Sequence, residues 1–119
     1  MRAIKFRGKR MNDNEWVYGY FGKDYSERCI INNYLNAPNE AWGVIPETIG
    51  QFTGVLDRNK KEVYEGDIVT WVCSDGETRK DVVRWINGGL CLCNSQYAVG
   101  SYYDLEVVGN IHDNPELIN

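Results

Sequence analysis

The feature that most constrains this chain is a glycine-centred turn between two runs of β-forming residues. Residues Val63 to Val69 read Val-Tyr-Glu-Gly-Asp-Ile-Val, and the apolar run continues through Trp71 and Val72. Such a turn, in a region where strand follows strand without an apolar pattern of helical length, is typical of small all-β binding modules. The sequence therefore predicts a mainly β protein, and it indicates a binding module rather than an enzyme fold.

The first part of the chain has the pattern of a β-hairpin followed by a loop. Residues 4–9 alternate between apolar and basic side chains, and residues 16–21 follow as a second strand after a polar turn. A short third strand is expected at 28–31. The stretch 32–43 is rich in Asn and contains a Pro, which predicts a long irregular loop.

The second part of the chain is denser in strand signals. Residues 47–54 predict a turn with a short strand, and 57–61 predict a polar turn. Beyond that turn the sequence predicts four strands at hairpin spacing, over residues 67–73, 82–86, 90–93 and 105–111. We therefore divide the chain into an N-terminal β-rich portion, 1–59, and a small barrel, 60–119, which together form one compact unit.

Charge is distributed unevenly along the chain. The 119 residues carry a formal net charge of −4, but residues 1–10 hold five bases and no acid. The remainder has eight bases against seventeen acids, a balance of −9. Because phosphate neutralisation supplies most non-specific affinity for nucleic acid, this balance disfavours a general nucleic-acid-binding role. No apolar run is long enough to span a bilayer and no signal peptide is recognisable, so we expect a cytoplasmic protein without membrane contact.

Residues that could support catalysis or metal binding are few. The four cysteines do not have zinc-ribbon spacing, and without a secretory signal we expect reduced, buried thiols. His112 is the only histidine and is expected at the surface or in a capping role. The chain has no phosphate-binding loop and no nucleophile elbow. We therefore expect no catalytic residue, no metal and no cofactor. The cysteines are Cys29, Cys73, Cys91 and Cys93.

The N-terminal hairpin is the most distinctive predicted surface. Its basic side chains are those of Lys5, Arg7, Lys9 and Arg10, and the rings on the facing strand are those of Trp16, Tyr18 and Tyr20. Cations beside aromatic rings could hold a nucleic-acid backbone and stack its bases, or pair with an acidic protein patch. The net negative charge favours a structural interpretation instead, in which the rings face the core and the cations keep an edge strand soluble.

Several segments of the chain resemble one known family. They are residues 4–10, 15–20, 46–54, 62–69 and 108–117, among them Pro46-Glu47-Thr48-Ile49-Gly50-Gln51-Phe52-Thr53-Gly54 and Val108-Gly109-Asn110-Ile111-His112-Asp113-Asn114-Pro115-Glu116-Leu117. Together they are similar to the YopX family of small phage and prophage proteins. The resemblance implies that the barrel in the C-terminal half is SH3-like and that the N-terminal portion is β-rich. It implies no established activity and carries no catalytic or binding residue with it.

These observations predict a phage- or prophage-encoded accessory protein that binds a macromolecule, with protein as the favoured partner. The first alternative is a nucleic-acid-binding module that uses the basic N-terminal hairpin. The second is a small hydrolase or metal-dependent enzyme, which predicts bound zinc or a deep pocket lined by His112 or the acids. A homo-oligomer, in which that hairpin docks on the acidic C-terminal strands of a neighbour, also stays open. Small barrels bind at their rims, so further candidate partner-binding residues are aromatic: Trp42, Tyr97, Tyr102 and Tyr103, with Trp71 and Trp85 as candidates for either the rim or the core.

Overall fold

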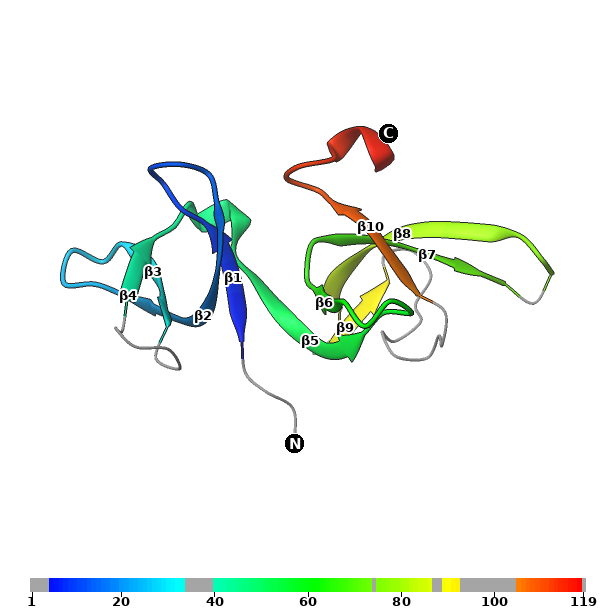
Figure 1. Ribbon diagram of the computed structural model, residues 1–119, viewed down its shortest axis with the longest axis horizontal. Helices are drawn as coiled ribbons and strands as arrows, with labels where there is room; N and C mark the ends of the chain where they lie inside the picture. The colour runs from blue at the N-terminus through cyan, green and yellow to red at the C-terminus, as the bar shows by residue number, and fades with distance from the viewer. Residues whose placement is uncertain (1–4, 34–39, 74, 87–88, 93–104, 119) are drawn as a thin grey trace. The chain divides into compact units, whose positions relative to one another are not determined.

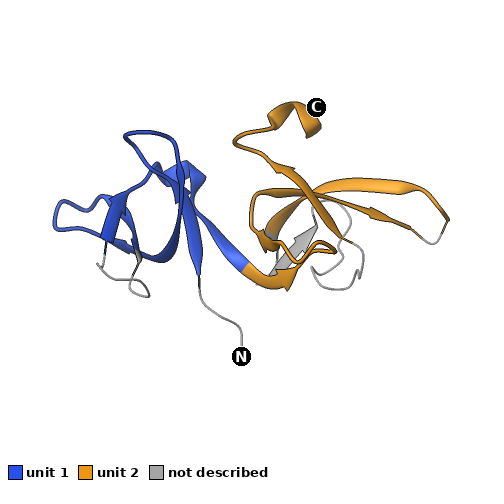
Figure 2. Cartoon of the chain, viewed as in Figure 1, with its two compact units in different colours: residues 1–52 blue, residues 53–119 orange. Residues whose placement is uncertain are grey.

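The computed structural model describes residues 5–33, 40–73, 75–86, 89–92 and 105–118, and for residues 33, 85–86 and 89–92 it describes the backbone only. The chain forms two compact units, residues 1–52 and residues 53–119 (Figure 2). We call these unit 1 and unit 2. The polar turn at 57–61 lies within unit 2. In the part of the chain that the structure describes, no helix is long and apolar enough to cross a membrane.

Unit 1 is built on the predicted hairpin (Figure 1). Strand β1 (Phe6–Lys9) pairs antiparallel with β2 (Trp16–Lys23), with Lys9 opposite Trp16 and Arg7 opposite Tyr18. The sheet order places β1 between β2 and β5. The expectation that β1 is an edge strand kept soluble by its charges is therefore wrong, because both of its edges are paired.

The third strand is also present. Strand β3 (Cys29–Asn33) pairs with β2 and with β4 (Glu40–Gly43). The long irregular loop predicted over 32–43 is therefore wrong at both ends, because Asn32 and Asn33 belong to β3 and residues 40–43 form β4 at the edge of the sheet. The Asn and Pro signals that suggested a loop lie mostly between the two strands, and they masked the four extended residues that follow.

An apolar cluster holds the strands of unit 1 together. Val17, Ile31 and Val44 are buried at its centre, and Phe6, Cys29, Trp42 and Ile49 pack around them. The glycine at position 8 belongs to this packing, because a Cβ there would lie 3.2 Å from the Cβ of Val44. Each Å² of apolar surface removed from water contributes about 25 cal/mol of stabilising free energy, so burial of these side chains is the main stabilising contribution in a unit of this size.

The sheet of unit 1 curls until the chain after β4 meets the end of β1. Arg10 and Val44 form a β-bridge, flanked by hydrogen bonds from Met11 N–H to Gly43 O (3.0 Å) and from Ile45 N–H to Lys9 O (2.9 Å). A short 3₁₀ helix (η1, Pro46–Thr48) follows. The Thr48 hydroxyl accepts a hydrogen bond from the Lys9 N–H at 2.8 Å and so fixes this corner.

Strand β5 (Gly50–Leu56) is longer than the short strand predicted over 47–54. Its first residues pair with β1, and β5 is also hydrogen-bonded to β6 (Glu62–Tyr64). The polar turn predicted at 57–61 is confirmed between these two strands, where Asp57 O accepts a hydrogen bond from the Lys60 N–H.

Unit 2 contains the predicted run of hairpins. Strands β7 (Asp67–Val72), β8 (Thr78–Ile86) and β9 (Gly89–Leu92) are consecutive antiparallel neighbours, and β10 (Glu106–Asn110) returns beside β7. The described chain ends in a 3₁₀ turn, η2 (Pro115–Ile118), which begins at a proline just after Asn114. All strand pairs with a described register are antiparallel. The described residues form strands and two short 3₁₀ helices, so the mainly β fold is confirmed.

The core of unit 2 decides the role of one candidate rim residue. Val63, Val69, Val83 and Leu105 are buried with Trp71, whose exposed fraction is 5%. Trp71 therefore serves packing. Alternation alone could not decide this, because Ile68 and Val69 are both fully buried and β7 is covered on both faces.

The Glu-Gly-Asp turn that opened the sequence analysis joins β6 to β7. Gly66 has a φ of +92°, a region that favours glycine, and its N–H and C=O bond Val83 O and the Ile111 N–H. The Asp67 carboxylate is buried and accepts the Tyr64 N–H at 2.7 Å. The turn is thus joined to both β8 and the chain after β10, which explains why this short sequence constrains so much of unit 2.

Cys29 and Cys73 are free and partly buried, each beside the apolar cluster of its own unit. Each packs against a different apolar cluster, and both are less buried than the buried thiols that the sequence predicts. The side chain of Cys91 and the whole of Cys93 lie outside the described residues.

Candidate functional site

The basic residues of the hairpin share one face of unit 1 with aromatic rings. Cross-strand partners lie on the same side of a sheet, so Lys9 and Trp16 share a face, as do Arg7 and Tyr18. The Arg7 guanidinium lies 4.6 Å from the centre of the Trp16 ring, and the Lys9 ammonium lies 5.5 Å from it. We call Lys5, Arg7, Lys9, Trp16, Tyr18 and Tyr20 the basic-aromatic face.

This arrangement corrects the favoured structural interpretation of the rings. The buried cluster of unit 1 is reached by Phe6 and Val17, which lie on the opposite face of β1 and β2. Tyr18 and Tyr20 are instead 45% and 38% exposed. The rings therefore accompany the cations and do not point into the apolar cluster.

The cations of the basic-aromatic face differ in accessibility. Arg7 has an exposed fraction of 6%, so its guanidinium is buried against Trp16. Lys5 lies 5.5 Å from the centre of the Phe52 ring. Since a cation over a ring contributes about 0.5–2 kcal/mol depending on its desolvation, these contacts stabilise unit 1 whatever else the face binds.

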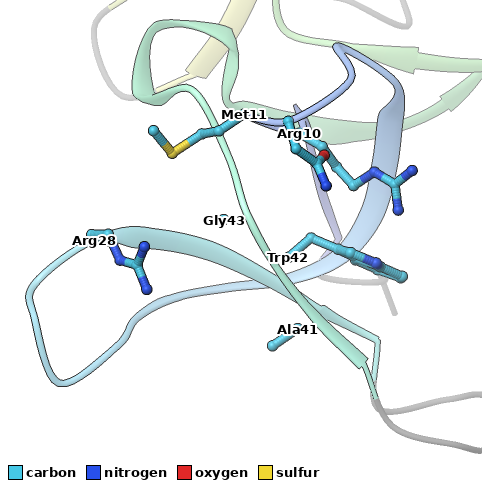
Figure 3. Close-up of a pocket in the computed structure, with 7 residues that line it drawn as sticks. Arg10, Met11, Arg28, Ala41, Trp42 and Gly43 are labelled. Carbon is cyan, nitrogen blue, oxygen red and sulfur yellow. The ribbon is translucent and has the colours of Figure 1, made fainter.

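The remaining described candidates, Arg10 and Trp42, come together at a different place. They line a cavity of about 250 Å³ beside β4, the edge strand of the sheet. The other lining residues are Met11, Asn12, Arg28, Ala41 and Gly43. Figure 3 shows Met11 and Arg28 on one side of the β4 backbone and Arg10 and the Trp42 indole on the other. We call it the edge cavity, because three of its lining residues belong to β4, the edge strand of the sheet.

The turn between β1 and β2 fixes Arg10. Both the Nε and an Nη nitrogen of Arg10 donate to the Asp13 carboxylate, and Asp13 Oδ1 also accepts the Glu15 N–H at 3.0 Å. The Arg10 hydrogen bond is the largest influence lowering the pKa of Asp13, and the same bond raises the pKa of Arg10. The guanidinium is thus held in one orientation by an anchored carboxylate.

The turn between β2 and β3 treats Arg28 in the same way. Asp24 Oδ1 accepts the N–H groups of Ser26 and Arg28, each at 2.9 Å, and Asp24 Oδ2 accepts Arg28 Nε at 2.9 Å. The backbone N–H of Arg28 is the largest influence lowering the pKa of Asp24. Only Nε of Arg28 takes part in this ion pair, and the side chain is 68% exposed, which leaves its terminal nitrogens directed to solvent or to a ligand.

The wall of the edge cavity includes a strand edge. Met11 and Gly43 are joined by a backbone hydrogen bond, and a Cβ at Gly43 would lie 3.8 Å from Met11 Sδ. Met11 is nevertheless 59% exposed. The cavity thus combines an exposed thioether, an indole, two anchored guanidinium groups and a strand backbone, and none of the described residues that line it is acidic.

Sequence reasoning found two of these residues and missed the others. The sequence places Met11 in the polar turn of the hairpin and Arg28 at the start of the predicted third strand, and neither position indicates a binding role. A signal for Arg28 existed in the spacing Asp24 to Arg28, because a turn aspartate can hold an arginine four residues later. The side chain of Trp85 and the whole of Tyr97, Tyr102 and Tyr103 lie outside the described residues. His112 is half-buried in unit 2, where its N–H donates to Asn110 Oδ1.

The fold and the edge cavity define a small two-unit β protein with an open site at a sheet edge. The family model described as YopX protein matches residues 5–119, and the chain therefore belongs to the YopX family. Among solved structures, the crystal structure of protein EF1440 from Enterococcus faecalis is similar, with a TM-score of 0.66 and 19% identity over 100% of both chains. At that identity the likeness shows the fold alone. No curated protein matches the chain significantly.

Proposed function

We propose that this protein is a phage- or prophage-encoded, non-catalytic accessory protein of the bacterial cytoplasm, and that it acts by binding a partner protein through unit 1. The observation that carries this proposal is the edge cavity, where Met11, Trp42, Arg10 and Arg28 meet. Aromatic residues, Met and Arg are the types enriched at protein interfaces, and Trp and Arg dominate their binding energy. The phage origin rests on family membership.

Affinity capture from bacterial lysate tests this proposal. The tagged full chain is incubated with nuclease-treated and untreated lysate at low and moderate salt. The expected result is a protein that is retained after nuclease treatment and lost when Met11→Glu places a charge in the edge cavity. Val72→Glu is the matched control, because Val72 is similarly exposed (61% against 59%) but belongs to unit 2. A partner that both variants retain, or no retained protein, would contradict the proposal.

Nucleic-acid binding is the second candidate, and the basic-aromatic face is the observation that favours it. Tyr18 and Tyr20 offer exposed rings beside cations, as single-strand-binding surfaces do. Binding of a labelled oligothymidylate that weakens steeply with salt, and is lost in Lys5→Gln and Lys9→Gln, would support it. Arg7 is unsuitable for this test because its burial makes a loss of folding the expected result of substitution.

We also propose that unit 2 has an SH3-like barrel architecture. Its support is the strand order β10-β7-β8-β9, a meander whose last strand returns beside its first, together with the separate strands β5 and β6. The test is a solution structure with through-space amide contacts. Contacts from β9 or β10 to β5 or β6 are expected for a closed barrel, and their absence in a complete data set would contradict the proposal.

A further inference from the structure

Among the residues that the structure describes, pairing along the outer edge of β4 stops at Gly43, beside the edge cavity. The end of β1 is hydrogen-bonded to residues 43–45, that is, to the last residue of β4 and the two residues after it. The β1–β2 turn then leads away at Met11. On its other side β4 pairs with β3, with Ile31 opposite Trp42 and Asn32 opposite Ala41. The outer edge of β4 at Ala41 is therefore the position at which an added strand would continue the sheet.

The direction of the Ala41 backbone groups follows from the antiparallel ladder. The Val44 N–H donates to Cys29 O at 3.1 Å, so Val44 and Cys29 form a hydrogen-bonded pair. Because such pairs alternate along a ladder, Trp42 also points its backbone groups toward β3, whereas Ala41 and Gly43 point theirs outward. The Gly43 carbonyl confirms this direction by accepting the Met11 N–H. The N–H and C=O of Ala41 thus point away from β3, toward the outer edge of β4.

The side chains around this edge indicate which segment would fit. A strand added to an edge sends alternate side chains to opposite faces of the sheet. Figure 3 draws Arg28 and Arg10 on opposite sides of the β4 ribbon, and both line the cavity, so an added strand would have two guanidinium groups nearby. A carboxylate is the side chain that a guanidinium binds most strongly, and it would have to add to the acids already near these arginines, which are Asp13, Glu15 and Glu40 beside Arg10 and Asp24 beside Arg28.

We propose that the edge cavity binds an extended, acidic segment of a partner protein, which pairs with the Ala41 backbone and places carboxylates against Arg10 and Arg28. This inference rests on the proposed function and specifies its partner. Main-chain hydrogen bonds supply the affinity in this mode of recognition, and the side chains on the two faces supply the specificity. The aspartates that anchor both arginines reduce the conformational entropy that binding would otherwise cost.

Fluorescence anisotropy of a labelled peptide tests the chemistry of the site. The probe is an extended peptide of repeated Val-Glu-Glu-Val, which offers carboxylates on both faces, and the control peptide replaces Glu by Gln. The full chain is expected to bind the acidic peptide, with amide shifts concentrated at Ala41 and Gly43. Arg28→Gln is expected to weaken binding about tenfold or more, since a charge-assisted hydrogen bond is lost.

Two variants separate strand addition from simple charge attraction. Ala41→Pro removes the outward N–H without breaking the β3–β4 ladder, and proline is tolerated on such an edge, so a similar loss is expected. Arg79→Gln is the matched control. Arg79 is also held by a turn aspartate four residues earlier, Asp75, but does not line the edge cavity. It is expected to bind the peptide as the unchanged chain does, and unaltered urea midpoints would show that all variants fold.

Several outcomes would overturn the inference. These are failure to bind the acidic peptide, equal binding of the Gln peptide, preference for an oligothymidylate, or an Ala41→Pro variant that still binds. Self-association that Ala41→Pro abolishes would assign the edge to a second copy instead. If Met11→Glu loses the captured lysate partner while Arg28→Gln and Ala41→Pro keep it, the proposed function stands and this inference alone fails.

Discussion

In unit 1 the turn aspartates Asp13 and Asp24 lie near the surface and each holds an arginine, whereas in unit 2 Asp57 and Asp67 are buried and serve the backbone. Asp24 and Asp57 start from the same local pattern, because each accepts N–H groups two and four residues later. What differs is the next partner. Asp24 binds the side chain of Arg28, while Asp57 binds the Val107 N–H.

The comparison shows how one local motif supports two roles. A carboxylate that accepts hydrogen bonds from a distant strand connects parts of a fold, and Asp57 joins the β5–β6 turn to β10 in this way. A carboxylate whose remaining oxygen reaches solvent can instead fix the orientation of a cation at the surface. In unit 2, Asp57 and Asp67 thus make their turns rigid, whereas Asp75 holds Arg79 at the surface; unit 1 uses two such surface turns to shape the edge cavity.

The largest expected effect is that of Asp57→Ala on the stability of unit 2. The change removes the acceptor of three backbone N–H groups, those of Asn59, Lys61 and Val107. Buried donors left without a partner cost about 1–3 kcal/mol each where water cannot replace the acceptor, so a loss of about 3 kcal/mol is expected. Urea unfolding measures it. A loss no larger than that of Asp13→Ala would break the contrast between buried and surface aspartates.

The pH dependence of stability should follow the same carboxylate. Burial alone would raise the pKa of Asp57, but the N–H groups of Val107, Lys61 and Asn59 outweigh it and lower that pKa. A lowered folded-state pKa contributes stability that is present above the unfolded value near 3.9 and is lost as pH falls through the folded value. Urea unfolding from pH 7 down to pH 2 should therefore show a steeper acid loss in the unchanged chain than in Asp57→Asn. Parallel curves would contradict this.

A smaller effect is expected from Gly66→Ala. The new Cβ would meet only ordinary contacts, the nearest being His112 Nε2 at 3.8 Å, so the cost comes from the positive φ of +92°. Such backbone strain costs about 1–2 kcal/mol. Gly22→Ala is the control, because nothing lies within 4 Å of its Cβ position and its φ is not in the left-handed region. Equal urea midpoints for the two variants would refute the strain argument.

The smallest stability effect, with the clearest functional contrast, is expected from Asp24→Asn. Surface ion pairs contribute little to folding, so the urea midpoint should stay close to that of the unchanged chain. The variant should nevertheless weaken binding of the acidic peptide, because Arg28 loses its anchor and its fixed orientation. Asp75→Asn, which releases Arg79 in unit 2, should leave the peptide affinity unchanged. A stability loss as large as that of Asp57→Ala would remove the distinction between the two units.

The sequence predicted much of the fold because most strands carry their own signal. The hairpin of β1 and β2, the Glu-Gly-Asp turn and the strands of unit 2 follow from alternation and turn residues. Strand β4 was missed because its four residues, Glu40 to Gly43, lack β-branched side chains, and pairing with β3 alone makes them extended. The prediction that β1 is an edge strand failed for a similar reason. Its second partner, Gly50 and Gln51 of β5, lies more than 40 residues away in the sequence, and no local signal indicates that pairing.

The candidate site divides in the same way. The sequence by itself determined that cations and rings alternate on the hairpin, because strand period and composition are local properties. It also singled out Arg10 and Trp42. Only the tertiary structure decided that Arg7 is buried and that Met11 and Arg28 join Arg10 and Trp42 around one cavity. The physical reason is that burial and convergence depend on how the sheet curls, which is set by pairing between residues far apart in the chain.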